Sequence, residues 1–260
     1  MFPQLLRRHR TTRGLSQERL AREAEISTRH LSCLETGRAQ PSKTMVLVLG
    51  SALDLPLRDR NAMLEAAGFV AAYRDVPLDA PDAASLRRAI GLILDGLEPN
   101  GAVAVDRAWN LLQMNQGAGR LLQTFLDPNE VPPEAMSNLV LGILHPKGLR
   151  NVIVNWEEVA IYTLERCRRE AARFPDAPDY AKLRDAIAKM PDVPEARSLP
   201  TRLEAPFLPV HLRRGDKEVR LFTLISTIGT PIDATAEDIR IETYFPADEA
   251  SARFLNGLIS

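Results

Sequence analysis

The chain has few of the residues on which disulfide-stabilised and metal-binding proteins depend. Only two of its 260 residues are cysteines. Cys33 and Cys167 lie in different predicted domains, so we expect neither a disulfide framework nor a cysteine-based zinc site. The four histidines are scattered and include no HExxH motif and no pair spaced i, i+4. The sequence therefore predicts no metal site.

The motifs of common catalytic sites are also missing. The sequence contains no GxSxG turn, no Gly-rich phosphate loop and no CxxC pair. Glu157 and Glu158 fall in the first turn of a predicted helix, where the helix dipole favours carboxylates without any catalytic role. Asp106 and Asp248 are interpreted as turn and capping residues. We therefore predict that the protein is not an enzyme and assign no catalytic residue.

Long apolar runs are absent as well. No uninterrupted run approaches the roughly 20 residues of a membrane-spanning helix, and the N-terminus lacks the apolar core of a signal peptide. Internal repeats and low-complexity tracts are absent too. We therefore expect a cytoplasmic protein with no membrane partner.

What the sequence does contain is a helix-turn-helix pattern between residues 14 and 42. Ser16 and Ser27 each precede a short helical run, where a serine hydroxyl accepts a hydrogen bond from a first-turn N–H group. Ile26 lies in the turn, and Gly37 follows the second run where a left-handed cap is expected. The residues at inward-facing spacing are apolar: Leu20, Ala21, Leu31 and Leu34. The outward positions of the second helix carry hydrogen-bonding groups.

This pattern resembles the Xre-type helix-turn-helix of the phage repressors. The resemblance rests on Gly14-Leu15-Ser16-Gln17, Leu20-Ala21, Ile26-Ser27 and Leu34-Glu35-Thr36-Gly37-Arg38, and it spans residues 5–68. It implies an all-α domain of five helices that binds a double-stranded DNA operator, commonly as a homodimer. Two further helices, expected at residues 44–53 and 57–67, complete that domain, with Met45, Val48, Leu49, Leu53 and Leu64 as its apolar residues.

The same resemblance implies which side chains contact DNA. In the family, the first residues of the second helix enter the major groove. By position, the residues nearest the base edges are Ser27, Thr28, Arg29 and Cys33. Arg29 is the candidate for a bidentate contact to guanine, whereas Cys33 reads a thymine methyl group or nothing. The residues expected to hold backbone phosphates are Gln17, Arg38 and Lys43.

Charge is distributed unevenly along the chain. Residues 1–43 contain nine Arg or Lys and four Glu, a local balance of +5 in a chain with a net charge of −1. Such a basic patch supplies the salt-dependent part of DNA affinity. The remainder is acidic by about six charges, so we expect a different role for it.

The remaining length is sufficient for a second domain. We predict a DNA-binding domain at residues 1–68, a linker rich in Pro, Gly and Asp at 69–84, and a domain of about 175 residues at 85–260. Helices are expected at 85–97, 116–125, 138–144, 155–174, 179–189 and 247–258. Strands are expected at 102–106, 109–114, 207–213, 219–227 and 239–245. This order predicts an α+β domain with a five-stranded antiparallel sheet covered by helices, the outline of a PAS-like sensor.

The second domain also resembles a known family, the MmyB-like transcription regulators. The motifs, in order, are Ala104-Val105-Asp106-Arg107-Ala108-Trp109-Asn110, Met114-Asn115, His145-Pro146, Asn155-Trp156-Glu157-Glu158-Val159-Ala160, Gly229-Thr230-Pro231 and Phe245-Pro246-Ala247-Asp248. The family implies a PAS-like fold with an apolar pocket, for which a fatty acid is the expected type of ligand. No other cofactor is expected.

We predict this pocket between the sheet and the helix at 155–174. Trp109 and Trp156 are candidates for its apolar wall, with packing in the core as the alternative. A carboxylate-headed ligand needs a polar anchor, for which the candidates are His145, Arg150, Asn155 and Tyr162.

Two hypotheses for the second domain remain open. In the first, the protein is a dimeric transcription regulator whose second domain senses a small apolar effector. In the second, that domain serves only dimerisation or protein docking. An internal apolar cavity distinguishes them, because a sensor needs one of about several hundred Å³.

Overall fold

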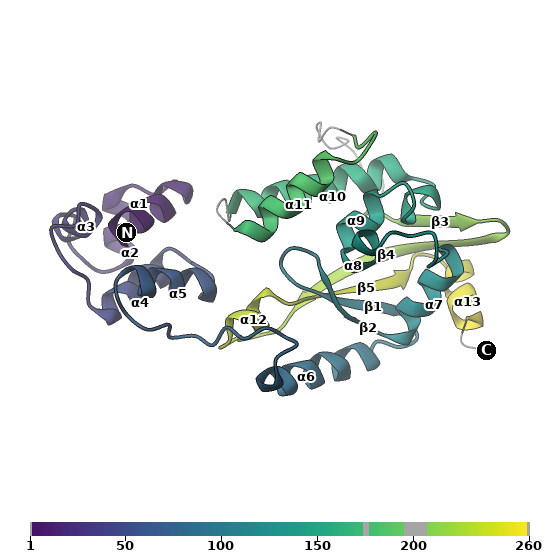
Figure 1. Ribbon diagram of the computed structural model, residues 1–260, viewed down its shortest axis with the longest axis horizontal. Coiled ribbons are helices and arrows are strands. Elements are labelled where there is room, and N and C mark those ends of the chain that lie inside the picture. The colour runs from purple at the N-terminus through teal and green to yellow at the C-terminus, as the bar shows by residue number, and fades with distance from the viewer. Residues whose placement is uncertain (1, 174–176, 195–206, 259–260) are drawn as a thin grey trace. The chain divides into compact units, whose positions relative to one another are not determined.

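The computed structural model describes residues 2–173, 177–194 and 207–258. The chain forms two compact units (Figure 1). The first unit contains residues 1–83 together with residues 228–238, and the second contains residues 84–227 and 239–260. The second segment of the first unit, residues 228–238, lies far along the chain from the first, and the sequence pattern did not indicate it.

The first unit is the predicted five-helix domain. Its helices are α1 (Phe2–Thr12), α2 (Gln17–Glu23), α3 (Thr28–Glu35), α4 (Lys43–Ala52) and α5 (Leu57–Ala66). Serine caps begin three of them, as predicted for the first two. Ser16 Oγ accepts from Arg19 N at 3.1 Å, Ser27 Oγ accepts from His30 N at 3.1 Å, and Ser42 Oγ accepts from Met45 N at 3.2 Å. These bonds satisfy first-turn N–H groups that have no partner inside the helix.

The core of this unit lies where the helices cross. The predicted inward residues Leu20, Ala21, Leu31 and Leu34 are all buried. Gly37 ends α3 with φ +74°, the left-handed conformation that glycine adopts most easily. One core prediction was wrong, because Val48 is exposed on α4 whereas Val46, three residues before buried Leu49, is buried. The i, i+3 spacing places Val46 and Leu49 on the inward face.

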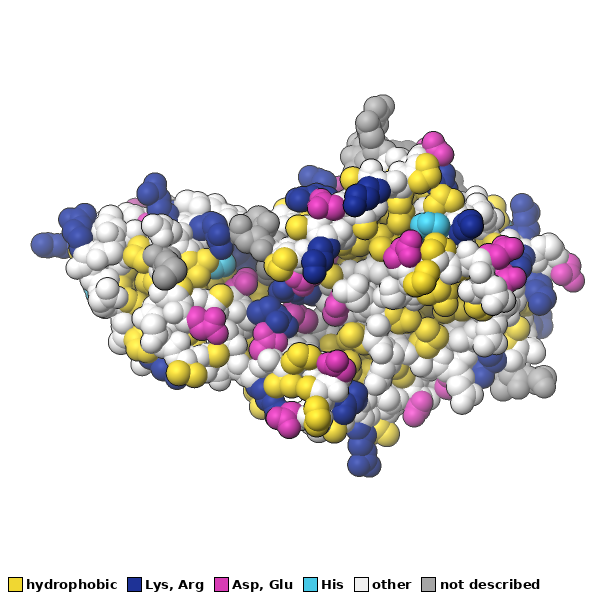
Figure 2. Space-filling model, in the orientation of Figure 1, with side chains coloured by type: hydrophobic (Ala, Val, Ile, Leu, Met, Phe, Trp, Pro, Cys, Tyr) yellow, Lys and Arg dark blue, Asp and Glu magenta, His cyan; other side chains and the backbone are white. Residues whose placement is uncertain are grey.

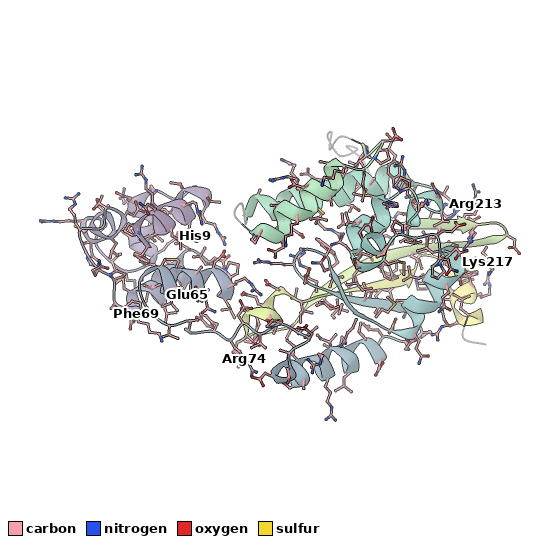
Figure 3. The ribbon with its side chains drawn as sticks, in the orientation of Figure 1. His9, Glu65, Phe69, Arg74, Arg213 and Lys217 are labelled. Atoms are coloured by element: carbon pink, nitrogen blue, oxygen red, sulfur yellow. The ribbon has the colours of Figure 1, made fainter. Side chains whose placement is uncertain are left out.

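The segment predicted as a linker packs against α5. The Asn61 side chain accepts from the N–H groups of Ala72 and Tyr73 and donates to Tyr73 O. Arg74, labelled in Figure 3, pairs with Asp233 in a short parallel bridge. Residues 70–76 and 228–238 are therefore held on the first unit by backbone and side-chain hydrogen bonds.

The second unit is built on a five-stranded antiparallel sheet, as predicted. The strands are β1 (Gly101–Val105), β2 (Leu111–Met114), β3 (Val210–Arg214), β4 (Lys217–Thr227) and β5 (Arg240–Pro246), in the order β2-β1-β5-β4-β3. A tight turn at Gly215 joins β3 to β4. Arg213 and Lys217 are exposed at that end of the hairpin (Figure 3).

Most helices of this unit match the predicted ones within a few residues. The described helices of the unit are α6 (Ala84–Asp95), α7 (Gln116–Phe125), α8 (Pro133–Ser137), α9 (Leu139–Leu144), α10 (Trp156–Arg173), α11 (Pro178–Ala188) and α13 (Glu249–Gly257). Phe174, the predicted end of the long helix, lies outside the described residues. The short elements η1 (Pro81–Ala83), η2 (Leu149–Asn151), α8 and α12 (Ala234–Asp238) were not predicted, since a single turn has no detectable periodicity.

Two buried asparagines fix the helices that follow β2 and α8. Asn115 Oδ1 accepts from Ala118 N and Ala102 N, so one side chain caps α7 and ties it to β1. Asn138 Oδ1 caps α9, while its amide donates to Ala108 O. Because both side chains are buried and fully engaged, α7 and α9 are held at fixed positions over the sheet.

One face of the sheet receives these helices. In β1 and β5 the side chains alternate between the two faces, and the register pairs Val103 with Glu242 and Gly101 with Tyr244. Gly101 lies so close to α7 that a Cβ atom there would meet Leu121 Cδ1 at 2.8 Å. The helices thus approach this face tightly at the end of β1, next to the position of Tyr244.

Candidate nucleic-acid interface and ligand pocket

The second helix of the helix-turn-helix, α3, presents the predicted base-contacting residues on its outer side. Ser27, Thr28 and Arg29 are exposed, and Cys33 is half-buried. Leu31 and Leu34 anchor the opposite side of α3 in the core. The side chains of Ser27, Thr28 and Arg29 therefore face solvent at the start of α3.

A buried ion pair holds α3 in place. The Arg10 guanidinium donates to both carboxylate oxygens of Glu35, with its Nε 2.6 Å from Oε1. Glu35 also accepts from Gln17 Nε2 at 2.8 Å. Burial raises the pKa of Glu35, but the hydrogen bonds from Arg10 and Gln17 and the charges of Arg10 and Arg7 outweigh it, so its pKa lies below the usual range. One carboxylate thereby joins α1, α2 and α3.

The three residues expected at phosphates lie around this helix pair. Arg38 and Lys43 are exposed, and Arg38 Nε donates to Thr36 Oγ1 at the end of α3. Gln17 is half-buried and its amide is directed to Glu35. Figure 2 shows Lys and Arg side chains projecting from the surface of this unit, as its local charge balance predicts.

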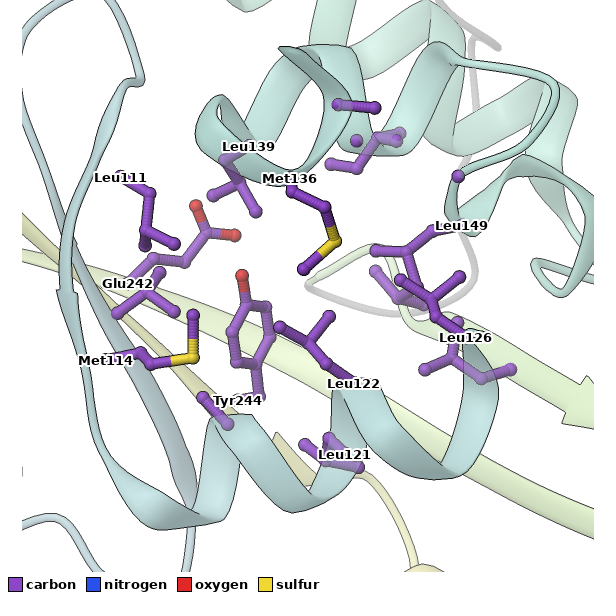
Figure 4. Close-up of a pocket in the computed structure, with 18 of the residues that line it drawn as sticks. Leu111, Met114, Leu121, Leu122, Leu126, Met136, Leu139, Leu149, Glu242 and Tyr244 are labelled. Carbon is purple, nitrogen blue, oxygen red and sulfur yellow. The ribbon is translucent and has the colours of Figure 1, made fainter. Parts of the chain in front are cut away.

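An apolar pocket lies inside the second unit, between the sheet and the helices α7, α8 and α9. Its volume is about 110 Å³. Its wall is made mainly of aliphatic and methionine side chains, among them Leu111, Met114, Leu121, Leu122, Leu126, Met136, Leu139 and Leu149 (Figure 4). The wall contains no residue of α10, so the pocket lies on the predicted face of the sheet but under different helices.

Two acidic side chains interrupt this apolar wall. Glu242 and Tyr244 occupy alternate positions on β5, the central strand, and their oxygen atoms point into the pocket (Figure 4). Glu242 is 4% exposed, and its Oε2 atom has no hydrogen-bond partner among the described residues. Burial raises the pKa of Glu242, although the charge of Arg166 acts in the opposite direction. Burial and the charge of Glu242 likewise raise the pKa of Tyr244, so its hydroxyl stays protonated.

The two tryptophans predicted for the pocket wall lie in the protein interior outside it. Trp109 is fully buried, and its Nε1 donates to Glu170. It does not lie on a strand as expected, because φ is +67° and the residue belongs to the turn before β2. Trp156 is half-buried and donates from Nε1 to Ile143 O. Their positions match the core alternative.

The four predicted polar anchors also lie away from this pocket. His145 borders a separate surface groove of α9 and α11, and its Nδ1 accepts from Lys147 N. Arg150 stacks on the Trp156 ring at 4.1 Å and donates to Pro191 O. Asn155 joins α10 to β3 through Pro209 O and His211 N. Tyr162 is half-buried on α10. The structure thus brings none of the four to the wall that Glu242 and Tyr244 interrupt.

Comparison with protein families accounts for both units. A helix-turn-helix domain model matches residues 3–63. The model of the MmyB-like transcription regulator ligand binding domain matches residues 86–258, about two thirds of the chain. The chain belongs to the MmyB-like transcription regulators. No curated protein matches it. This MmyB-like regulator is a DNA-binding transcription regulator, and both of its matched domains are of regulator type.

Among residues 2–173, 177–194 and 207–258, no helix has both the length and the apolar character needed to cross a membrane. In the same ranges, no group of three or more His, Cys, Asp or Glu is arranged to hold a metal ion.

Sequence reasoning missed Glu242 and Tyr244, although a signal for them exists. In the strand Arg240–Pro246 the three consecutive residues 241–243 are buried, so both faces of this central strand are covered. A glutamate in the middle of such a strand breaks the apolar pattern, which marks it as a candidate binding residue in an MmyB-like regulator.

Proposed function

We propose that this MmyB-like regulator binds an inverted-repeat operator as a homodimer and changes its DNA affinity when a small apolar molecule occupies the pocket on the sheet. The exposed first turn of α3 supports the DNA contact, with Ser27, Thr28 and Arg29 directed to bases and Cys33 beside them. Half-sites would lie about one helical turn, roughly 34–36 Å, apart. Arg38, Lys43 and Gln17 would contact phosphates. Gln17 lies at the start of α2, with its side chain beside that of Glu35.

The apolar pocket is the observation that carries the sensing role. It lies within the domain that matches the ligand-binding model, and its wall is almost entirely hydrocarbon. A domain that served only docking would have close-packed side chains at this place and no cavity. The apolar wall therefore favours sensing over the alternative of a domain for dimerisation or docking alone, whereas the volume is below that expected of a sensor from the sequence.

The volume of the pocket restricts the size of the ligand. At about 110 Å³, the space is smaller than the several hundred Å³ that we expected. A cavity of about 150 Å³ lined by apolar side chains binds benzene, so a single ring is at the upper limit of what this pocket holds as it stands. The acyl chain of a fatty acid, the ligand type that the family resemblance implies, would require side chains such as Met114 or Met136 to move. Methionine adapts easily to such changes because it is unbranched and flexible.

For the pocket to act as a switch, the ligand must bind the DNA-competent and DNA-incompetent arrangements with different affinity. The size of that difference sets the regulatory range. A tenfold change in operator affinity corresponds to about 1.4 kcal/mol.

The decisive experiment is native mass spectrometry of the purified full-length protein, followed by denaturing extraction and identification of any released molecule. We expect a dimer that carries a small apolar compound, and we expect that compound to change operator affinity in a fluorescence anisotropy titration. A protein that is empty, and that no member of a lipid and aromatic panel stabilises thermally, would exclude sensing and favour the docking alternative.

A further inference from the structure

The buried carboxyl group in the pocket wall is unusual in energetic terms. Glu242 lies in the middle of the central strand, with Val103 beside it on β1 and Ile225 beside it on β4. Val103 and Glu242 both line the pocket. A buried polar atom without a hydrogen bond costs about 1–3 kcal/mol, and a charged one costs more. Most buried polar groups in proteins are therefore paired, yet Glu242 Oε2 is buried without a partner among the described residues.

The protein offers Glu242 no neutralising contact in the pocket. The lining contains no Lys, Arg or His within the described part of the chain. Arg166 is the basic residue whose charge influences Glu242. However, its guanidinium stacks over the Trp109 ring, 3.9 Å from the ring centre, and it does not line the pocket. A molecule in the pocket can therefore supply a partner for the Glu242 carboxyl group.

The other polar groups of the wall narrow the chemistry further. Asn138 has its side chain committed to capping α9 and to the carbonyl of Ala108. Tyr244 carries a protonated hydroxyl two residues from Glu242 on the same face of β5 (Figure 4). The polar end of the pocket thus combines a carboxyl group with a phenol and with the hydroxyl of Thr223, which pairs with Tyr244 in the register of β4 and β5. A ligand carboxylate placed there would repel an ionised Glu242, whereas an N–H or O–H group would supply the missing donor.

We infer that this pocket, whose occupation by a ligand rests on the proposed function, selects small apolar molecules with a hydrogen-bond-donating head group, an amine or an alcohol, over carboxylates. The head group donates to Glu242 Oε2, and the Tyr244 hydroxyl is placed to contact the same group. The hydrocarbon part lies against the aliphatic wall formed by α7, α8 and α9. An ammonium head makes a charge-assisted hydrogen bond, which is shorter and stronger than a neutral one.

The test compares ligands that differ only in the head group. Benzylamine, benzyl alcohol and benzoate share one small apolar ring. Their affinities for the full-length protein are measured by ligand-detected NMR titration at pH 7. We expect the amine or the alcohol, or both, to bind at least about tenfold more tightly than benzoate, the difference that one hydrogen bond to a charged group produces. Tighter binding by the amine indicates an ionised Glu242, and tighter binding by the alcohol indicates a neutral one.

Two variants assign the preference to Glu242. Glu242→Gln removes the charge with little change in volume, and we expect the preference over benzoate to fall below about threefold. Glu157→Gln is the matched control, because Glu157 is exposed on α10 and its loss removes the same charge. The control should keep the wild-type preference. The wild-type comparison stands by itself if the Glu242 variant does not fold.

The outcomes separate this inference from the proposed function. Benzoate binding as tightly as the donor ligands, or an unchanged preference in Glu242→Gln, would overturn the inference and leave the pocket as a ligand site. If none of the three binds, decylamine, decanol and decanoate repeat the comparison with a longer apolar part. Failure of all six to bind would overturn the proposed function itself, and the inference with it.

Discussion

At the scale of single residues, the DNA-binding role depends on a few exposed side chains at the start of α3. Ser27 has two functions there, because its hydroxyl caps the helix through His30 N while its side chain remains exposed. Arg29, two residues later, is exposed in the first turn. Among the described residues, no side-chain hydrogen bond holds Arg29 in another position. Its planar guanidinium can donate to the O6 and N7 atoms of one guanine.

The first prediction concerns the difference between base and phosphate contacts. We expect Arg29→Ala to weaken operator binding by about 1–3 kcal/mol and to relax base preference at one position of each half-site. Lys43→Ala should weaken binding to all operator sequences similarly. It should also lower the slope of log affinity against log salt by about one. Fluorescence anisotropy with a set of single-base operator variants measures both effects.

Arg88→Ala serves as the control, since Arg88 is exposed on α6 of the other unit. It should leave affinity and preference unchanged. An Arg29→Ala protein with the wild-type base preference would remove Arg29 from the interface.

At the scale of elements, the Glu35 carboxylate connects three helices. Arg10 belongs to α1, Gln17 to α2 and Glu35 to α3, and the Glu35 side chain is 2% exposed. Removing one partner of a buried ion pair leaves the other charge uncompensated, which is strongly destabilising. The position of α3 therefore depends on the ionisation of one residue.

The second prediction concerns acid stability. The pKa of Glu35 is lower in the folded protein than in the unfolded chain, so the folded state favours the ionised form. The resulting stability is present above the usual carboxyl pKa of about 4.3 and is lost as the pH falls through the lower folded value. We expect Glu35→Gln to lower the free energy of unfolding by about 1–3 kcal/mol at pH 7, and the deficit to shrink as the pH falls below about 4.

Urea unfolding of the full-length protein at a series of pH values measures this deficit. Glu65→Gln is the control, because Glu65 is exposed on α5. A deficit that did not change with pH would show that the carboxylate charge is not what joins the three helices.

At the scale of the whole molecule, the connection between β4 and β5 belongs to the DNA-binding unit. Residues 228–238 leave the sheet after β4, pack in the first unit and return as β5. Within that unit, Glu237 Oε2 accepts from Leu57 N at 2.6 Å, where α5 begins after Pro56 without a side-chain cap of its own. Asp238 forms an ion pair with Arg58. The strands on either side of this connection, β4 and β5, both line the pocket.

The third prediction is that this connection transmits ligand binding to the DNA-binding unit. If the proposed function is correct, the double substitution Glu237→Gln with Asp238→Asn should leave ligand affinity within about twofold of wild type. The ligand-induced change in operator affinity should decrease by about threefold or more, within the usual range of coupling energies. Operator titrations with and without the effector measure both quantities. Glu65→Gln again provides the control, and a full ligand response in the double variant would contradict transmission through residues 228–238.

The sequence by itself determined the helix-turn-helix and most of the sheet, because local rules govern them. Serine caps, the i, i+3 spacing of Leu31 and Leu34, and the glycine at position 37 act within a single turn or helix, and the structure confirms them. Alternation and turn residues similarly predicted the strands and their antiparallel arrangement. Trp109 departs from the expected strand through another local interaction, because Asp106 Oδ1 accepts from Ala108 N and Asn110 N in the turn before β2.

Only the tertiary structure decided where the pocket lies and what lines it. Arg150, Asn155 and Trp156 have suitable chemistry for a ligand site, yet each is engaged in packing or in joining elements. Glu242 is a charged residue on the central strand, and its side chain reaches the pocket because α7, α8 and α9 cover that face of β5. Residues 228–238 likewise join the first unit through bonds to α5 across about 180 positions of sequence. Contacts between segments so distant in the chain depend on the packing of whole elements, which local sequence patterns do not encode.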